Sequence, residues 1–381
     1  MQIGVPAETA AGESRVAATP ETVQKLLRQG HVVRVQAGAG QWASAPDVAY
    51  EAVGAQMTDA AGALGCPMVL KVRAPSDAEL ALMQPGAVLV GMLEPFHAEG
   101  LQKMAAAGLT VFALEAAPRI TRAQGMDALS SQASVSGYKA VLLAANHLPR
   151  LFPMMMTAAG TIQAARVVVL GVGVAGLQAI ATAKRLGAVV QASDVRPVVR
   201  EQVESLGAKF IDVPFETAEE KEAAEGAGGY ARAMPASWLA RQQQEVARRV
   251  AQADVVIATA LVAGRPAPQL ITEEMLSHMK PGSVIVDIAA GRGVPNADGS
   301  VGGNCPLTVP GQTVVRRGVT LIGQTNLPAL VAADASSLYA RNVLDFLKLL
   351  LPENQTLTID LHDDIVAACL VARDGAVLLH V

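Results

Sequence analysis

The sequence predicts an α/β protein with two parallel-sheet lobes joined by two long helices. Short apolar runs alternate with amphipathic stretches along most of the 381 residues, a rhythm typical of βαβ units. Hydrophobic residues make up 51% of the chain but aromatic residues only 3%, and small aliphatic side chains suit helices packed closely on a sheet. At roughly 150 residues per domain, this length favours two domains or three.

The first third of the chain predicts one series of strands and helices. The amphipathic stretches 21–28, 76–83 and 98–107 are expected to be helices. Short apolar runs are expected to be the strands of a parallel sheet, at 2–5, 32–35, 68–72, 88–92 and 110–113.

Two long helices are expected at 127–148 and 338–350, where apolar residues recur at helical spacing. Between them lies a second β/α series. We therefore expect a first domain of residues 1–134 completed by 323–381, and a second domain of residues 135–322. The strands of the second series are expected at 166–170, 188–192, 208–211, 254–258 and 283–287, with a polar loop at 216–229.

Composition and charge exclude several classes of function. The net charge is −4 and no basic run is present, so a nucleic-acid partner is not expected. The three cysteines are far apart and the six histidines form no paired motif; no metal site is predicted, and the cysteine usage fits a reducing cytosol. The N-terminus has no apolar signal core, and the most apolar stretch, 167–183, is interrupted by glycines, so direct membrane insertion is not expected.

A glycine-rich motif follows the first strand of the second series. Gly171, Gly173 and Gly176 form G-x-G-x-x-G between the apolar run 167–170 and the helical stretch 177–186. Such glycines allow a tight turn and let backbone N–H groups approach a pyrophosphate at the helix N-terminus. The strand–turn–helix context favours a Rossmann-like dinucleotide fold. Two alternatives to a bound NAD(H) remain: a glycine turn without a ligand, and a site in the same fold for FAD or S-adenosylmethionine.

An acidic residue follows the next strand. Asp194 lies eighteen residues after Gly176, a spacing typical of the acid that accepts hydrogen bonds from the adenosine ribose. Its charge repels a 2′-phosphate and favours NAD(H) over NADP(H). Arg196 nearby could instead accept that phosphate, but the acid at the strand end carries more weight.

Essentially the whole chain resembles the proton-translocating NAD(P) transhydrogenase family, in particular its soluble NAD(H)-binding domain. The wider superfamily includes alanine dehydrogenase. The similar stretches are IGVPAET and ESRVAATPETV near the N-terminus, the run from Met156 through the glycine turn to Ala188, GGNCPL at 302–307, and GQTNLPALVAADAS at 323–336.

One segment, PRITRAQGMDALSSQ at 118–132, resembles the transhydrogenase loop that lies over the nicotinamide end of NAD(H). The resemblance implies that Arg119, Gln124, Asp127 and Ser130 hold the ring and its ribose. Hydride transfer requires no nucleophile, only two rings held in contact in the right orientation. By residue type alone, Asp127 or Ser130 could simply cap a helix.

The resemblance implies further nucleotide contacts and two departures from the family pattern. The stretch 288–300 is extended, and the acid usually found just before GGNC is replaced, which bears on cofactor geometry. The acidic loop before Gly228 is also longer than usual. The further implied contacts are Val174, Asp194, Val195, Arg196, Gly229, Tyr230, Gln242 and Leu261.

Two other functions remain open. A stand-alone enzyme of the alanine dehydrogenase type would need a catalytic histidine, but Glu94 occupies that position and His97 is three residues away. Arg15 and Lys71 match substrate-binding positions of that enzyme, although salt-bridged surface groups are the commoner fate of a lone Arg or Lys. A non-catalytic NAD(H)-binding module is the third possibility.

The transhydrogenase resemblance also implies partners and a location. NAD(H) would bind to this chain, and hydride would pass directly to NADP⁺ on a partner domain that binds NADP(H). A membrane-spanning subunit is expected to complete the assembly, and the chain itself is expected to be a homodimer. The expected location is cytoplasmic and peripheral, on the inner face of the cytoplasmic membrane through the partner subunits.

Overall fold

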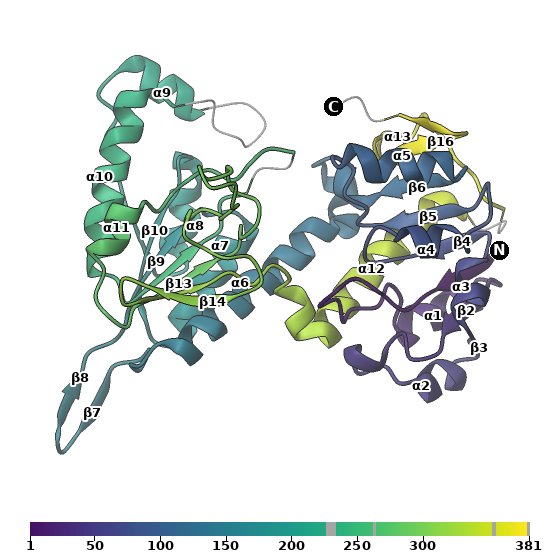
Figure 1. Cartoon of the computed structure of the whole chain (residues 1–381), viewed down its shortest axis with the longest axis horizontal. Helices are drawn as coiled ribbons and strands as arrows, with labels where there is room; N and C mark the ends of the chain where they lie inside the picture. Colours follow the sequence, from purple (N-terminus) through teal and green to yellow (C-terminus); the bar gives the residue numbers. More distant parts are fainter. Residues whose placement is uncertain (226–233, 262–263, 353–355, 379–381) are drawn as a thin grey trace. The chain divides into compact units, whose positions relative to one another are not determined.

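The computed structural model describes residues 1–225, 234–261, 264–352 and 356–378. The chain divides into two compact units, one formed by Met1–Gln132 with Pro328–Val381 and the other by Ala133–Leu327. Both are α/β units whose sheets are mainly parallel (Figure 1). The long helix α6, Ala128–His147, spans the boundary at residue 132.

The first unit contains an eight-stranded sheet in the order β17-β16-β6-β5-β4-β1-β2-β3. Strands β1 to β6 are parallel, and the C-terminal segment adds β16 antiparallel to β6. The strands are β1 (Gln2–Val5), β2 (Val32–Gln36), β3 (Gln56–Thr58), β4 (Met68–Leu70), β5 (Val88–Gly91), β6 (Thr110–Ala113), β16 (Leu370–Arg373) and β17 (Ala376–Val377). The helices are α1 (Pro20–Arg28), α2 (Asp47–Ala52), α3 (Ala60–Leu64), α4 (Asp77–Leu80), α5 (Ala98–Ala106), α12 (Ala332–Leu350) and α13 (Asp364–Cys369), with 3₁₀ turns η1 (Gln41–Ala43), η2 (Leu114–Ala116), η3 (Thr121–Met126) and η5 (Pro328–Val331).

Both faces of this sheet are covered. Met68 and Leu70 of β4 belong to the core that contains α12, whereas Val69 between them belongs to the core that contains α5. This alternation follows from the two-residue period of a strand. The face of α12 predicted from its spacing is buried, and Phe346 packs on Phe112 of β6 with ring centroids 5.5 Å apart.

The second unit contains a seven-stranded sheet in the order β11-β10-β9-β12-β13-β15-β14. Its core clusters lie on opposite faces, since Val167 and Val169 of β9 join one and Val168 and Leu170 the other. The strands are β9 (Arg166–Leu170), β10 (Val189–Ser193), β11 (Lys209–Phe210), β12 (Val255–Ala258), β13 (Val284–Asp287), β14 (Thr313–Arg316) and β15 (Val319–Ile322). The helices are α7 (Val174–Arg185), α8 (Arg200–Ser205), α9 (Ala218–Glu225), α10 (Ala236–Gln252) and α11 (Glu273–Ser277), with the 3₁₀ turn η4 (Pro197–Val199).

Several features differ from the sequence prediction. Strand β14 runs antiparallel to β15 at the sheet edge, and the short strand β3 extends the other sheet. Residues 218–225 of the predicted polar loop form the helix α9. The rest of that loop, from residue 226, lies outside the described residues.

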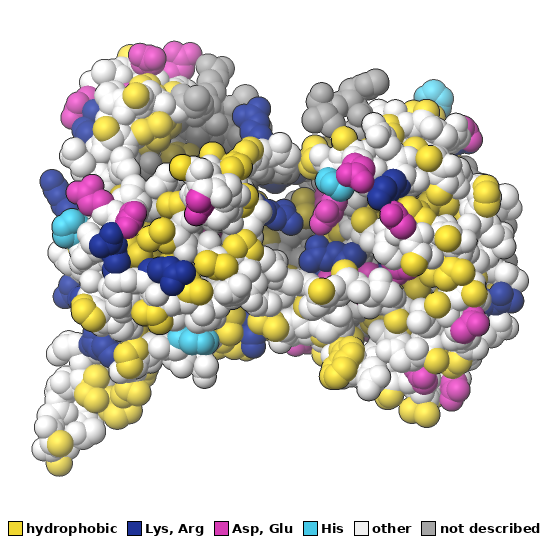
Figure 2. Space-filling model, viewed as in Figure 1, with side chains coloured by type: hydrophobic (Ala, Val, Ile, Leu, Met, Phe, Trp, Pro, Cys, Tyr) yellow, Lys and Arg dark blue, Asp and Glu magenta, His cyan; other side chains and the backbone are white. Residues whose placement is uncertain are grey.

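A two-stranded hairpin stands apart from both large sheets. Strands β7 (Met155–Thr157) and β8 (Gly160–Ile162) are exposed along their whole length. Figure 2 shows hydrophobic side chains gathered on this hairpin. Of the helices in the described ranges, none is long and apolar enough to cross a membrane.

Candidate functional site

The glycine turn joins β9 to α7 at the carboxyl edge of the second sheet. Two of its glycines are required by the fold. Gly171 has φ +93°, and a Cβ on Gly176 would lie 2.0 Å from the Gly171 carbonyl oxygen. The hydroxyl of Thr259 donates to that same carbonyl at 2.8 Å and so ties the turn to the end of β12.

Gly173 differs from the other two glycines, because no atom of the described residues beyond its chain neighbours lies within 4 Å of the position its Cβ would take. It is the N-cap of α7, which carries no side-chain cap. An exposed, uncapped helix N-terminus beside open space allows a phosphate to approach the backbone N–H groups. The local structure therefore fits a bound dinucleotide better than an empty glycine turn.

Asp194 lies directly after β10 and bonds to the glycine turn. Its carboxylate accepts a hydrogen bond from the amide of Val172 at 2.7 Å. Arg196 also binds it, through Nε at 3.0 Å, Nη2 at 3.0 Å and the backbone N–H at 2.9 Å. The strand order places β10 and β12 on either side of β9, and such a reversal of strand order is where open α/β sheets bind ligands.

The other residues of this unit that were predicted to contact the nucleotide differ in exposure and in their contacts. Val174 is exposed in the first turn of α7, and Leu261 is exposed after β12. Gln242 of α10 donates to the hydroxyl of Ser193 at 3.4 Å, next to Asp194. Val195 packs against a small separate core of Val213, Ala223, Met234 and Trp238. Gly229 and Tyr230 lie outside the described residues.

A buried carboxylate that the sequence analysis did not single out organises the GGNC turn. Asp287 accepts from the amides of Asn304 at 3.1 Å and Cys305 at 2.9 Å, and from the hydroxyl of Thr308 at 2.9 Å. A Cβ on Gly303 would lie 2.4 Å from this carboxylate. Burial raises the pKa of Asp287, and these hydrogen bonds act in the opposite direction. An acid at a strand end followed by paired glycines was the available signal.

Asn304 fastens two loops at the same edge of the sheet. Its side-chain amide donates to the carbonyl oxygens of Ala260 and Pro268, each at 2.8 Å. The extended stretch after β13 is held nearby, because Ala267 donates to the Arg292 carbonyl at 2.6 Å. This stretch therefore packs on the loop that carries Leu261.

The segment predicted to hold the nicotinamide lies in the first unit. Arg119 and Gln124 are exposed, and Gln124 belongs to the 3₁₀ turn η3. Asp127 accepts from both the amide and the hydroxyl of Ser130, at 2.8 and 2.5 Å. Asp127 thus caps the start of α6, the structural role that its residue type alone allowed. Arg122 fixes the segment to α13 through Asp363, with Nη1 2.5 Å from the carboxylate.

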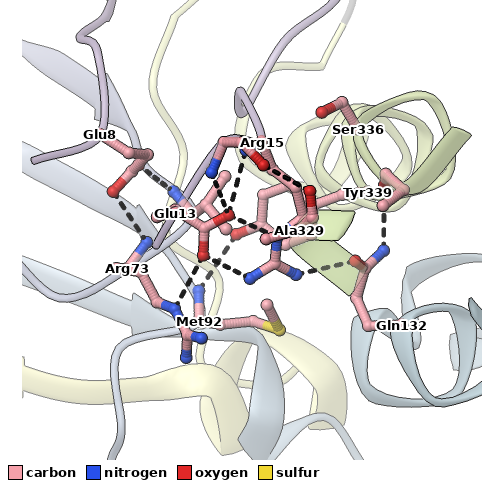
Figure 3. A network of polar contacts seen from close by, with 12 residues as sticks. Glu8, Glu13, Arg15, Arg73, Met92, Gln132, Ala329, Ser336 and Tyr339 are labelled. Atoms are coloured by element: carbon pink, nitrogen blue, oxygen red, sulfur yellow. Dashed lines mark hydrogen bonds and ion pairs between the residues drawn. The ribbon is translucent and has the colours of Figure 1, made fainter. Parts of the chain in front are cut away.

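Arg15 and Lys71 are buried, which corrects the expectation of salt-bridged surface groups. The pairing was predicted rightly and the exposure wrongly. Arg15 donates to Glu13 through Nε at 2.8 Å and Nη2 at 2.6 Å (Figure 3). Lys71 lies 2.7 Å from Glu79 and 3.3 Å from Glu8. These cations are retained in the interior because carboxylates neutralise them.

Glu94 occupies a strained position after β5. Its φ is +54°, in the left-handed region. The Glu115 carboxylate accepts from the amides of Leu93 at 3.0 Å and Glu94 at 2.9 Å, and burial raises the pKa of Glu115. His97 caps α5, accepting from the amide of Gly100 at 3.3 Å.

Comparison with known proteins gives matches along the whole chain. Residues 4–136 match the model of the alanine dehydrogenase/PNT N-terminal domain, and residues 140–380 match that of the C-terminal domain. The chain is 48% identical to the first of the alpha-subunit polypeptides of NAD(P) transhydrogenase from Rhodospirillum rubrum, covering 99% of this chain and 98% of the relative.

A solved transhydrogenase structure and a more distant alanine dehydrogenase also match most of the chain. The crystal structure of transhydrogenase from Sinorhizobium meliloti superposes with a TM-score of 0.87 at 44% identity, covering 99% of this chain and 100% of the other. Alanine dehydrogenase of Mycobacterium tuberculosis is 30% identical over 87% of this chain and 82% of its own length. The chain is therefore clearly more similar in sequence to the transhydrogenases than to alanine dehydrogenase.

Proposed function

Because the chain belongs to the alanine dehydrogenase/PNT family, and within it to the NAD(P) transhydrogenase alpha subunits, we propose that it binds NAD(H) and exchanges hydride directly with NADP(H) on a partner domain. The nicotinamide supplies the hydride chemistry when bound. The chain's own task is to bind and orient that ring.

The open space at Gly173 is the observation that carries this proposal. Gly171 and Gly176 are explained by packing within the protein, but Gly173 is not. A glycine at an uncapped helix N-terminus, with no other described residue against its Cα face, is suited to a pyrophosphate. The Asp194–Arg196 pair at the neighbouring strand end is then placed for the adenosine ribose.

The nicotinamide end is assigned to Arg119, Gln124, Asp127 and Ser130. Their amide, carboxylate, hydroxyl and guanidinium groups can fix a ring that bears a carboxamide. Asp127 and Ser130 already share two hydrogen bonds, so their geometry is set before a nucleotide binds. Such preorganisation favours transfer, since the two rings must meet in one orientation.

An amino-acid dehydrogenase activity is disfavoured by the charges in the first unit. An oxo-acid substrate would need free cations for its carboxylate, but Arg15 and Lys71 are each paired with glutamates in the interior. Glu94 replaces the histidine that would act as acid and base, and adds negative charge.

From the similarity to transhydrogenase alpha subunits we infer that a membrane-spanning subunit holds this chain at the inner face of the cytoplasmic membrane.

We also infer that two copies of the chain pair through the β7–β8 hairpin. Met154, Met155 and Met156 are 56%, 42% and 74% exposed. A hollow of about 610 Å³ at the hairpin base is lined by Leu148, Leu151 and other side chains. Apart from Arg150 the hollow is lined by apolar side chains, so the apolar hairpin residues of one copy could enter the hollow of the other in a two-fold interface. Met156→Asp should lower the mass measured by sedimentation to that of a monomer.

The deciding experiment is NADH-dependent reduction of NADP⁺ by the purified chain, with and without an added NADP(H)-binding transhydrogenase domain. Rapid turnover only in the mixture supports the proposal. An inert mixture in which NADH still binds overturns it. Oxidation of alanine with NAD⁺, measured in parallel, tests the dehydrogenase alternative.

A further inference from the structure

We propose that Asn342 is a positioning residue for hydride transfer, because its one side chain holds both ends of the segment that carries Asp127 and Ser130. This inference rests on the function proposed above. Asn342 lies on α12 and is only 8% exposed. Its side chain bonds to chain neighbours of the residues assigned to the nicotinamide.

The two ends are bound by opposite halves of the Asn342 amide. Nδ2 donates to the carbonyl oxygen of Gly125 at 2.8 Å, and Oδ1 accepts from the hydroxyl of Ser131 at 2.6 Å. Gly125 follows Gln124 directly, and Ser131 follows Ser130. A single rigid group therefore sets where both ends of the 125–131 stretch lie.

The chemistry of the contact restricts which residue can serve. The Gly125 carbonyl can only accept, so its partner must donate, while the short contact with Ser131 uses an acceptor. A carboxamide offers both functions a little over 2 Å apart by covalent geometry. An ionised carboxylate of the same shape would face the Gly125 carbonyl with no proton to share.

Neighbouring contacts hold the same segment against the rest of the unit. Gly125 lies close to α12, since a Cβ added to it would be 2.8 Å from the Asp345 carboxylate, one turn beyond Asn342. Gln132, after Ser131, accepts from Arg15 at 2.7 Å (Figure 3). It also donates to the Ala335 carbonyl at 3.0 Å. The backbone is thus fixed on its inner side, while the side chain of Gln124 is left exposed.

A displacement of this segment should affect transfer far more than nucleotide binding. Reacting groups must be held to within fractions of an ångström, and a misplacement of about 1 Å can cost about 100-fold in rate. Overall affinity depends mainly on the rest of the nucleotide. The expected signature is a lower transfer rate with little change in the dissociation constant.

The test compares Asn342→Ala with Ser336→Ala in the full chain. Ser336 lies on the same helix, is fully buried, and accepts from the Val16 amide at 3.0 Å, so its loss disturbs α12 without touching the segment. Single-turnover transfer to the NADP(H)-binding domain, NADH affinity and urea stability are measured for each. We expect Asn342→Ala to slow transfer by about 100-fold with NADH affinity within about threefold, and Ser336→Ala to keep the wild-type rate.

Asn342→Asp supplies a readout that a purely structural role would not give. The ionised variant cannot donate to Gly125, but its protonated form can. Its transfer rate should therefore rise relative to wild type as the pH falls, at unchanged NADH affinity. Equal rates for Asn342→Ala and Ser336→Ala, or an Asn342→Asp rate that tracks wild type at every pH, would overturn the inference while leaving the proposed function intact. An inert wild-type mixture would instead overturn both.

Discussion

Asp194 and Arg196 form a bidentate ion pair at the end of β10, with Nε and Nη2 of the arginine each 3.0 Å from a different carboxylate oxygen. The Val172 amide and the Arg196 amide donate to the same carboxylate. The acid expected to select the nucleotide thus already has four donors from its own chain. Selectivity between NAD(H) and NADP(H) should depend on the pair rather than on Asp194 alone.

Replacing the acid should change which nucleotide binds. Asp194→Asn removes the negative charge that Asp194 places beside the Arg196 guanidinium, so the positive charge there attracts a 2′-phosphate more strongly. We expect the ratio of NADPH to NADH affinity to rise by about tenfold, or about 1.4 kcal/mol. Equilibrium titration with both nucleotides measures it. Arg196→Gln is the matched control and should move the ratio the opposite way; an unchanged ratio in both variants would contradict the assignment.

Two glycines of the turn should respond differently to alanine. Gly176→Ala places a Cβ 2.0 Å from the Gly171 carbonyl and should destabilise the protein by about 1–3 kcal/mol. A Cβ on Gly173 meets no atom of the described residues beyond its chain neighbours, and φ is −82°, so Gly173→Ala should keep a stability close to wild type while its NADH affinity falls. Urea unfolding and NADH titration of both variants separate the effects. Normal NADH affinity in Gly173→Ala would show that no phosphate lies there.

Shortening the exposed amide of the nicotinamide segment should slow the reaction selectively. Gln124→Asn keeps the amide but withdraws it by one methylene, and an orienting contact matters most in the transition state. We expect slower hydride transfer, with NADH affinity within about tenfold of wild type. Stopped-flow transfer to the NADP(H)-binding domain is the measurement. A wild-type rate would remove Gln124 from the site.

Much of the fold follows from local sequence, whereas its edges do not. The Gly171–Gly176 turn could be predicted because its strand, glycines and helix are contiguous. β16 pairs with β6 across more than 250 residues, and no local pattern encodes that partner. The edge strand β14 turns into β15 at Arg317 and Gly318, which both have positive φ. Arginine is not among the residues that signal such a turn, so the local sequence did not predict this hairpin.

In the candidate site, the sequence predicts individual residues but not which side chains contact one another. Residue types and spacing indicate Asp194 and Arg196 individually, but not that they bind each other. Lys71 could not be recognised as buried, because its carboxylate partners Glu8 and Glu79 come from other segments. Glu13 is only two residues from Arg15, but the burial of that pair depends on the folded chain, in which Gln132 accepts from Arg15. Asn342 is 217 residues from Gly125 in sequence, so only the folded chain connects them.

His31 should make the stability of the first unit depend on pH. It is 4% exposed and its Nδ1 has no hydrogen-bond partner within the described residues. Burial, together with the positive N-terminus, lowers the pKa of His31 below its ordinary value of 6.5. Between the folded and unfolded pKa values the unfolded state binds more protons, so stability is complete above about pH 6.5 and decreases as the pH falls.

Substitution of this histidine should therefore flatten the acid side of the stability profile. His31→Phe fills a similar volume without a proton to take up, and its urea midpoint should fall less than that of wild type between about pH 7.5 and pH 5.5. His278→Gln, at an exposed histidine, is the control and should follow wild type. A His31→Phe profile as steep as wild type would mean that other groups, such as the buried carboxylates, cause the acid sensitivity.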